Sequence, residues 1–176
     1  GEVVQHECTP DPSLPLVAHV FKITSDPYVG KMAMFRVHQG TLKAGDQPLV
    51  GTSRKGVRVA HVYTVHGSEH GEVPQLVAGD IGGVAKIDEL DFDDVMHDGR
   101  IAEDLHLRPV PLPRPMHGLA IEGTSKGAET KMGEALRKLV AEDPCLPAER
   151  VAAPGDTGIR RLGEQHLRAQ PAALSK

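Results

Sequence analysis

The sequence predicts a mixed, two-domain protein in which an antiparallel β-barrel is followed by an α+β domain of the ferredoxin-like type. Two observations predict this class. Short runs rich in Val, Ile and Phe recur between turn residues from Leu16 to Ile87, with no helical period among them. Beyond residue 115 the pattern changes to a strand, a helix, two strands and a second helix, which is the ferredoxin-like order without its last strand.

Four prolines between Leu107 and Pro115 form a stiff, extended connector, which marks the boundary between the two patterns. We therefore expect four segments: an irregular lead-in over residues 1–14, the barrel over 15–106, the Pro-rich connector over 107–115 and the incomplete ferredoxin-like domain over 116–176.

The run Met32–Val37, between Gly30 and Gly40, is the clearest strand of the predicted barrel. Its odd-numbered residues share one face and its even-numbered residues, Arg36 among them, share the other, because strand side chains alternate. Further strands are expected at 16–23, 47–50, 57–65 and 81–87, with a charged hairpin loop at 51–56 and a polar loop at 66–74.

One helix is predicted in the second domain from apolar residues that recur at helical spacing, and Pro144 ends it. These apolar residues are Ala128, Met132, Ala135, Leu136, Leu139 and Val140. Strands at 116–121, 149–153 and 158–161 and a second helix at 163–170 complete the expected unit.

Composition narrows the classes of function. Only 3% of the 176 residues are aromatic and Trp is absent, so the cores must be aliphatic. Cys8 and Cys145 are too isolated for a disulfide framework or a metal site, and a reduced, cytoplasmic setting is expected. No apolar run approaches the roughly 18 residues that span a bilayer. The chain begins at Gly1 without Met, as a piece of a longer protein would.

Charge is unevenly distributed, although the net charge is only −4. Seven Lys or Arg residues stand against two acids between Leu16 and His66, whereas eight acids stand against Arg100 between Asp88 and Asp104. We therefore expect one end of the barrel to meet phosphates while another edge repels them.

No catalytic, nucleotide or metal site is expected in this chain. A GTPase phosphate loop requires Lys and then Ser or Thr at its end, but Gly51–Gly56 is followed by Val57 and Gly118–Gly123 by Thr124. His61, His66 and His70 lack an acidic or Cys partner at ligand spacing. The acidic run at 91–96 lacks the glycine of a calcium loop, and no Gly-x-Ser-x-Gly elbow occurs.

Several motifs, however, resemble elongation factor G and its relatives among the translational GTPases. The second domain of that family is similar to Asp26-Pro27-Tyr28-Val29-Gly30, Phe35-Arg36-Val37, Gly40-Thr41-Leu42 and Ala78-Gly79-Asp80-Ile81. The third domain is similar to the helix at 131–144 and to Leu162-Gly163-Glu164-Gln165-His166-Leu167. Asp93 stands where relatives have the glycine of a Gly-Asp-Thr-Leu turn, and Gln165 replaces a leucine. Pro171 falls where the second helix would continue.

The resemblance implies that this piece docks a GTP-hydrolysing parent on the ribosome. The implied partners are small-subunit ribosomal RNA, a small-subunit ribosomal protein and the parent's own GTPase domain, with no membrane. GTP and Mg²⁺ would bind that N-terminal domain, and this chain itself would carry no cofactor and no catalytic residue. Arg36, Arg54, Lys55 and Arg58 are the implied RNA-facing residues. Structural roles fall to Asp26, Pro27, Gly30, Gly40, Gly79, Asp80, Gly163, Glu164 and His166.

Alternatives remain open at this point. Within the family, the parent is a housekeeping factor, a divergent paralogue, a ribosome protection protein or a release factor, and the departures at Asp93 and Gln165 favour the paralogue. Outside the family, the rival interpretations are a stand-alone β-barrel that binds a protein or small ligand, and a His-dependent metalloenzyme.

Overall fold

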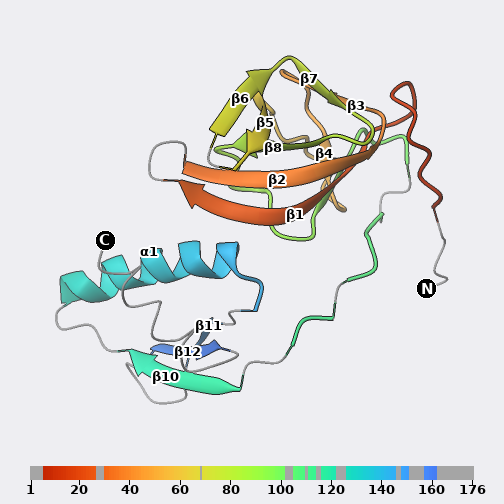
Figure 1. The fold of residues 1–176 in the computed structure, drawn as a ribbon. Helices are drawn as coiled ribbons and strands as arrows, with labels where there is room; N and C mark the ends of the chain where they lie inside the picture. Colours follow the sequence, from red (N-terminus) through yellow and green to blue (C-terminus); the bar gives the residue numbers. More distant parts are fainter. Residues whose placement is uncertain are drawn as a thin grey trace. The chain divides into compact units, whose positions relative to one another are not determined.

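The computed structural model describes residues 6–26, 30–67, 69–101, 105–109, 111–113, 116–121, 126–145, 148–150 and 157–161. The chain divides into two compact units, Gly1–Pro109 and Val110–Lys176. Figure 1 shows the strands of the first unit and the helix and strands of the second.

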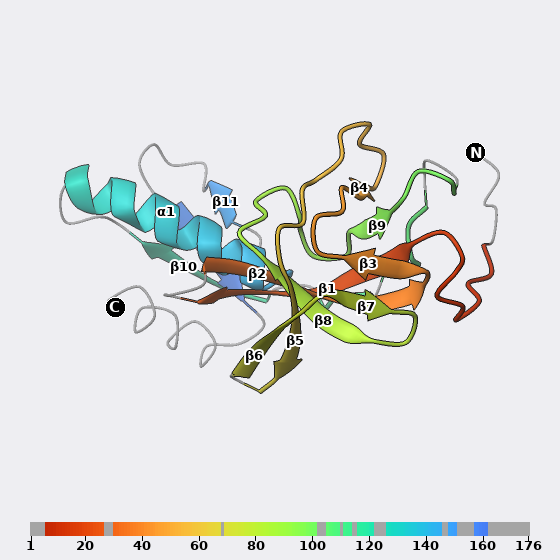
Figure 2. The ribbon, with the colours of Figure 1, turned by 90° about the horizontal axis from the view of Figure 1, so that it is seen from above.

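The first unit is built from antiparallel strands that curl around one core (Figures 1 and 2). Seven strands form one sheet in the order β4-β9-β1-β2-β8-β5-β6, and β3 pairs with β7. Long strands β1 (Val17–Asp26) and β2 (Gly30–Gln39) lie at its centre. The others are β3 (Thr41–Lys43), β4 (Leu49–Val50), β5 (Val62–His66), β6 (Glu69–Val73), β7 (Gln75–Val77), β8 (Ile81–Ala85) and β9 (Val95–His97).

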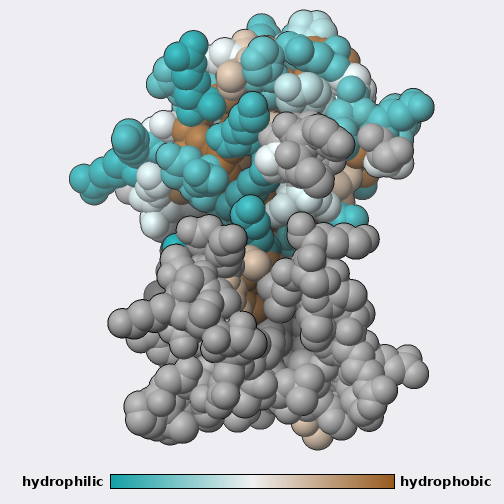
Figure 3. Space-filling view, turned by 90° about the vertical axis from the view of Figure 1, so that its left-hand side faces the viewer, coloured by the Kyte–Doolittle hydropathy of each residue, from teal (hydrophilic) through white to brown (hydrophobic). Residues whose placement is uncertain are grey.

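The core lies on the inward face of this sheet, and strand alternation fills it as predicted. Ala33, Phe35 and Val37 of β2 are buried, whereas Arg36 between them is exposed. Not every apolar residue is enclosed, because Phe21 and Ile81 are 37% and 48% exposed. Figure 3 shows apolar surface on one side of this unit, framed by hydrophilic side chains.

Two sequence-based boundaries in the barrel are wrong. The predicted loop at 66–74 contains strand β6, which pairs with β5 from Val62↔Val73 to His66↔Glu69. The polar sequence of β6 conceals it, since this strand lies at the edge of the sheet and its side chains are mostly exposed. The strand predicted from Val57 begins only at Val62, because Val57 and Val59 instead make isolated backbone hydrogen bonds to Pro48 and Asp46.

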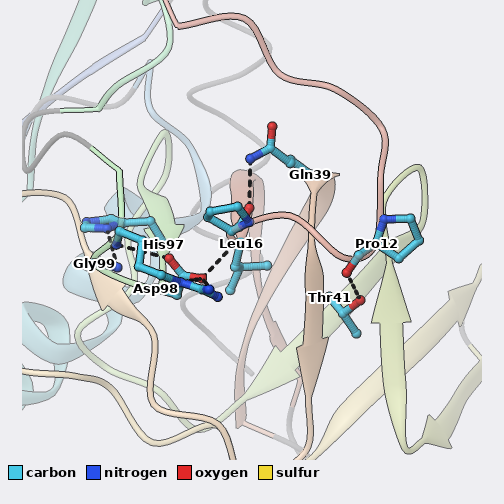
Figure 4. Close-up of polar contacts among 9 residues, drawn as sticks. Pro12, Leu16, Gln39, Thr41, His97, Asp98 and Gly99 are labelled. Carbon is cyan, nitrogen blue, oxygen red and sulfur yellow. Dashed lines mark hydrogen bonds and ion pairs between the residues drawn. The ribbon is translucent and has the colours of Figure 1, made fainter.

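The lead-in is fixed on the end of the barrel by hydrogen bonds from side chains (Figure 4). Buried Gln39 donates to Pro15 O at 3.0 Å and accepts from Thr9 N, and Thr41 Oγ1 donates to Pro12 O. Asp98 accepts from Leu16 N at 3.1 Å. These contacts tie a Pro-rich segment with no regular structure to strands that lie far along the chain.

The buried side chain of His97 joins two further segments of the barrel. Its ring is 1% exposed, Gly99 N–H donates to Nδ1, and Nε2 therefore carries the hydrogen that it donates to Gly51 O at 2.9 Å. A neutral imidazole thus joins the end of β9 to the turn that follows β4.

The second unit combines helix α1 (Lys126–Glu142) with strands β10 (His117–Ile121), β11 (Ala148–Arg150) and β12 (Thr157–Arg161). The strand order β10-β12-β11, all antiparallel, is the order expected when a helix connects the first two strands of a ferredoxin-like unit. On α1, Leu136 is buried and packs with Met132, Leu139 and Val140, which confirms these four residues of the predicted apolar stripe. No helix in the described ranges is long and apolar enough to cross a membrane.

Gly40 is the residue that lets the lead-in approach β2. Its φ is +77°, and an added Cβ would stand 2.7 Å from Leu14 O and 2.8 Å from Leu16 N. Gly45 has a similar φ of +93° but open space around it, which makes it a matched control.

We predict that Gly40→Ala lowers the free energy of unfolding of the barrel by about 2–5 kcal/mol, as the sum of left-handed strain and overlap with backbone. Gly45→Ala should cost only the strain, about 1–2 kcal/mol. Urea denaturation followed by circular dichroism measures both. Equal losses for the two variants would show that the lead-in does not constrain Gly40.

Candidate nucleic-acid interface

Arg36 lies on the outward face of the sheet. Strand β2 is paired on both sides, so the residue has His19 of β1 opposite it on one side and Ile81 of β8 on the other. Its guanidinium is exposed and has no acidic partner within the described residues. The geometry leaves this cation free to meet an anion from outside.

The other three predicted RNA-facing residues lie in and after the turn that follows β4, and all three are exposed. Ser53 shapes this turn: its backbone N donates to Val50 O, and its hydroxyl bonds both the N and the O of Lys55. Arg54 and Arg58 flank that position. Arg36 belongs to the sheet, whereas these cations belong to a separate loop.

The acidic segment lies beside that loop rather than at another edge. A cavity of about 300 Å³ is lined by Ser53, Lys55 and Gly56 on one side and by Glu89, Asp91 and Asp94 on the other. Burial raises the pKa of the Asp94 carboxyl, and the neighbouring Asp91 and Asp93 charges add to this. The expectation that the basic and acidic segments occupy different edges is therefore wrong for Lys55, which faces carboxylates.

A three-residue cluster that sequence reasoning missed lies next to Arg36. His19 donates from Nε2 to Asp93 Oδ1 at 2.8 Å, and its ring centre is 6.2 Å from that of His38. The Nε2 atom of His38 is buried without a hydrogen-bond partner. Burial lowers the pKa of His38, and the charges of His19 and Arg36 lower it further.

Asp93 adopts a left-handed backbone conformation in the turn that precedes β9. Its φ is +72°, in the left-handed region that Asp tolerates better than most residues. Backbone bonds from Asp93 N to Val20 O and from Val20 N to Asp94 O hold it against β1. The Asp93 side chain adds the bond to His19.

The predicted structural residues shape the turns around β2. Asp26 and Gly30 are backbone partners across the first turn, where Gly30 has φ +83°. Gly79, at φ +100°, donates its N–H to Val37 O, and Asp80 Oδ2 accepts from Val77 N at 2.8 Å. Pro27, Gly163, Glu164 and His166 lie outside the described residues.

The side chains of His61, His66 and His70 do not form a common metal site. His61 Nδ1 lies 2.7 Å from Glu72 Oε1, whereas His66 stands opposite Glu69 at the far end of the hairpin. Across the described ranges, no three His, Cys, Asp or Glu residues are placed to hold a metal ion.

Comparison with known proteins agrees with this geometry. Family models match residues 15–99 as elongation factor G domain 2 and residues 112–175 as elongation factor G, domain III. A crystal structure of a protein from Thermus thermophilus is similar over 93% of this chain, with a TM-score of 0.78 and 34% sequence identity. The chain spans 24% of that protein's length.

These matches define a protein of the translation elongation factor type, with the barrel and the α+β unit in the predicted order. The chain belongs to the elongation factor G family and contains its domains II and III.

His38 makes the stability of the barrel depend on pH. Because its pKa is lowered in the folded state, the unfolded chain takes up the proton first as pH falls below about 6.5. We predict that the free energy of unfolding decreases between about pH 7.5 and pH 5.5, and that His38→Gln reduces this decrease.

Urea denaturation at the two pH values measures the effect. Exposed His66 provides the control, and His66→Gln should leave the pH dependence of wild type unchanged. His19 and Arg36, whose charges act on His38, are intact in both variants. A His38→Gln protein with the full wild-type decrease would contradict the assignment.

Proposed function

We propose that this chain docks an elongation factor G-type translational GTPase on the small ribosomal subunit. The observation that carries the proposal is the presence of two consecutive elongation factor G domains, the first of which exposes Arg36 on a paired, rigid strand without an acidic partner among the described residues. A fixed guanidinium of this kind suits the phosphates of ribosomal RNA.

The four cations contribute unequally to RNA binding. Arg36 is the first RNA contact, and Arg54 and Arg58 of the loop are secondary ones. Lys55 contributes less, since Glu89, Asp91 and Asp94 line the same cavity and compete with phosphate for its charge.

The parent couples GTP hydrolysis to movement of tRNA and mRNA, and a GTPase domain outside this chain binds GTP and Mg²⁺. Supporting this, neither glycine-spaced segment carries the phosphate-loop lysine. The Gly51–Gly56 turn also follows β4 without leading into a helix. A small-subunit ribosomal protein and the parent's GTPase domain are the further partners, and the setting is cytoplasmic.

Binding to small ribosomal subunits tests the docking role. We predict that the chain co-sediments with purified subunits at low salt and that affinity falls as salt rises. Arg36→Gln should weaken binding about tenfold and reduce the slope of log affinity against log salt by about 1, because one phosphate contact is lost.

Lys55→Gln is the matched control, since it removes the same charge from a site that faces carboxylates. Its affinity should stay within about twofold of wild type, on the scale of exposed ion pairs. Absence of co-sedimentation at low salt would refute the docking role. A larger loss of affinity for Lys55→Gln than for Arg36→Gln would show that the loop, rather than the face of β2, contacts the RNA.

Nucleotide binding tests the second part of the proposal. Titration calorimetry of this chain with Mg²⁺-GTP should give only the heat of dilution, because the lysine that reaches the β- and γ-phosphates is missing from its sequence. Micromolar GTP binding would refute the assignment of nucleotide chemistry to another domain.

A further inference from the structure

The register between β1 and β2 shifts at Phe21. Val20 is paired with Phe35 and Lys22 with Met34, so β1 advances by two residues where β2 advances by one. Phe21 has no partner of its own in β2, which makes it the extra residue of a β-bulge. The two strands are paired on both sides of this point and lie side by side (Figure 1). The bulge is therefore a local insertion in a long pair of strands.

The bulge turns two consecutive side chains away from the core. In a regular strand the side chains alternate, so one of Phe21 and Lys22 would point inward. Here Val20 and Ile23 are buried, whereas Phe21 is 37% exposed and Lys22 is exposed as well. The outer face of β1 thus carries one residue more than a regular strand would place there.

The pairing of the strands does not require Phe21. Without this residue, the pairs on either side of it would follow one another directly, and every other pair would keep its place. The strand is also fixed just before the bulge, because Val20 N donates to Asp94 O at 2.8 Å and Val20 O accepts from Asp93 N at 2.9 Å. The Phe21 ring has no aromatic partner among the described residues. An inserted, exposed aromatic residue of this kind is typical of a bulge that presents a contact side chain.

Two cations lie on the same outer face as Phe21. Lys22 stands opposite Met34, and Arg36 is two residues along β2 from Met34, so the two cations are diagonal neighbours about 7–8 Å apart. Both are exposed, and neither has an acidic partner within the described residues. An exposed ring and two cations therefore share one part of the sheet surface.

We propose that the Phe21 bulge is an RNA contact, in which Lys22 and Arg36 bind neighbouring phosphates of one strand and an unpaired base of that strand stacks on the exposed Phe21 ring. The inference rests on the proposed docking to ribosomal RNA and names an unpaired strand as the ligand. A ring at the surface of a sheet, with cations beside it, is the combination that binds single strands, whereas a duplex hides its base faces.

Photochemical cross-linking tests the contact in the complex with small ribosomal subunits. With p-azidophenylalanine in place of Phe21, irradiation at low salt should join the chain to the RNA of the subunit. The same residue in place of Leu14 is the matched control, since Leu14 is also 37% exposed but belongs to the lead-in. It should give no cross-link to RNA.

Affinities for a labelled single-stranded octa-adenylate separate the ring from the charges. Phe21→Leu should weaken binding roughly tenfold, as loss of one base stack does, while Phe21→Tyr, which keeps the ring, should stay within about twofold. Phe21→Leu should leave the affinity for an RNA duplex of equal length unchanged. Fluorescence anisotropy measures these affinities, and circular dichroism confirms that each variant is folded.

The salt dependence of octamer binding tests the two cations. Lys22→Gln and Arg36→Gln should each lower the slope of log affinity against log salt by about 0.7, and the double variant by about 1.4, because each cation neutralises one phosphate of a single strand. Lys43→Gln is the control, since this exposed lysine lies on β3, and its slope should equal that of wild type. An unchanged slope for Lys22→Gln would refute the two-phosphate contact.

The outcomes distinguish this proposal from the docking role on which it rests. If small subunits bind in an Arg36-dependent way but position 21 gives no RNA cross-link and Phe21→Leu binds normally, the bulge contact is refuted and docking stands. A cross-link from position 21 to a ribosomal protein instead of RNA would also refute the contact. Octamer binding that depends on Phe21 and Lys22, without any subunit binding, would support the contact and refute docking.

Discussion

The position of β2 between β1 and β8 is the constraint on which the rest of the first unit depends. Pairing on both sides fixes its register, and a slip by one residue would bring Arg36 into the core and Phe35 to the surface. Left-handed glycines hold the ends of this pairing: Gly40 gives the lead-in room at the end of β2, and Gly79 bonds Val37 across to the start of β8. The core residue Phe35 and the exposed Arg36 thus lie on two faces of one strand, and neither can change register without the other.

Position in the fold, rather than charge along the chain, decides which cations can bind phosphate. Lys55 belongs to the most basic part of the sequence, yet it shares a cavity with carboxylates that lie 34 to 39 residues away. Arg36 belongs to the same basic part but projects from the paired strand β2, where the nearby Asp93 carboxylate is already bonded to His19. A sum of charges over this segment of the sequence does not distinguish Lys55 from Arg36. The fold does distinguish them, because it places Lys55 beside carboxylates and Arg36 on the paired strand β2.

Much of the fold could be predicted because apolar periodicity is a local property. The alternation in β2 and the stripe of α1 follow from short runs of sequence, and both were predicted correctly. Strand β6 could not be predicted, since an exposed edge strand needs no apolar face and Glu69–Val73 has none. The cluster next to Arg36 could not be predicted for a different reason. The bond between His19 and Asp93 joins residues 74 positions apart, and only the pairing of β1 and β2 places His19 opposite Arg36.

Asp93 connects the turn before β9 to the electrostatic surroundings of Arg36. Its carboxylate offsets part of the cost of a left-handed residue by accepting a hydrogen bond from His19, and His19 stands directly opposite Arg36. The ring of His19 is thereby held near His38, whose lowered pKa keeps it neutral at physiological pH. Arg36 consequently presents its charge beside a neutral imidazole and a carboxylate-bound one, so the positive potential at this part of the sheet face comes chiefly from one guanidinium. A glycine at position 93 would keep the turn and leave His19 without this bond, which would alter the electrostatics next to Arg36 but not the frame that carries it.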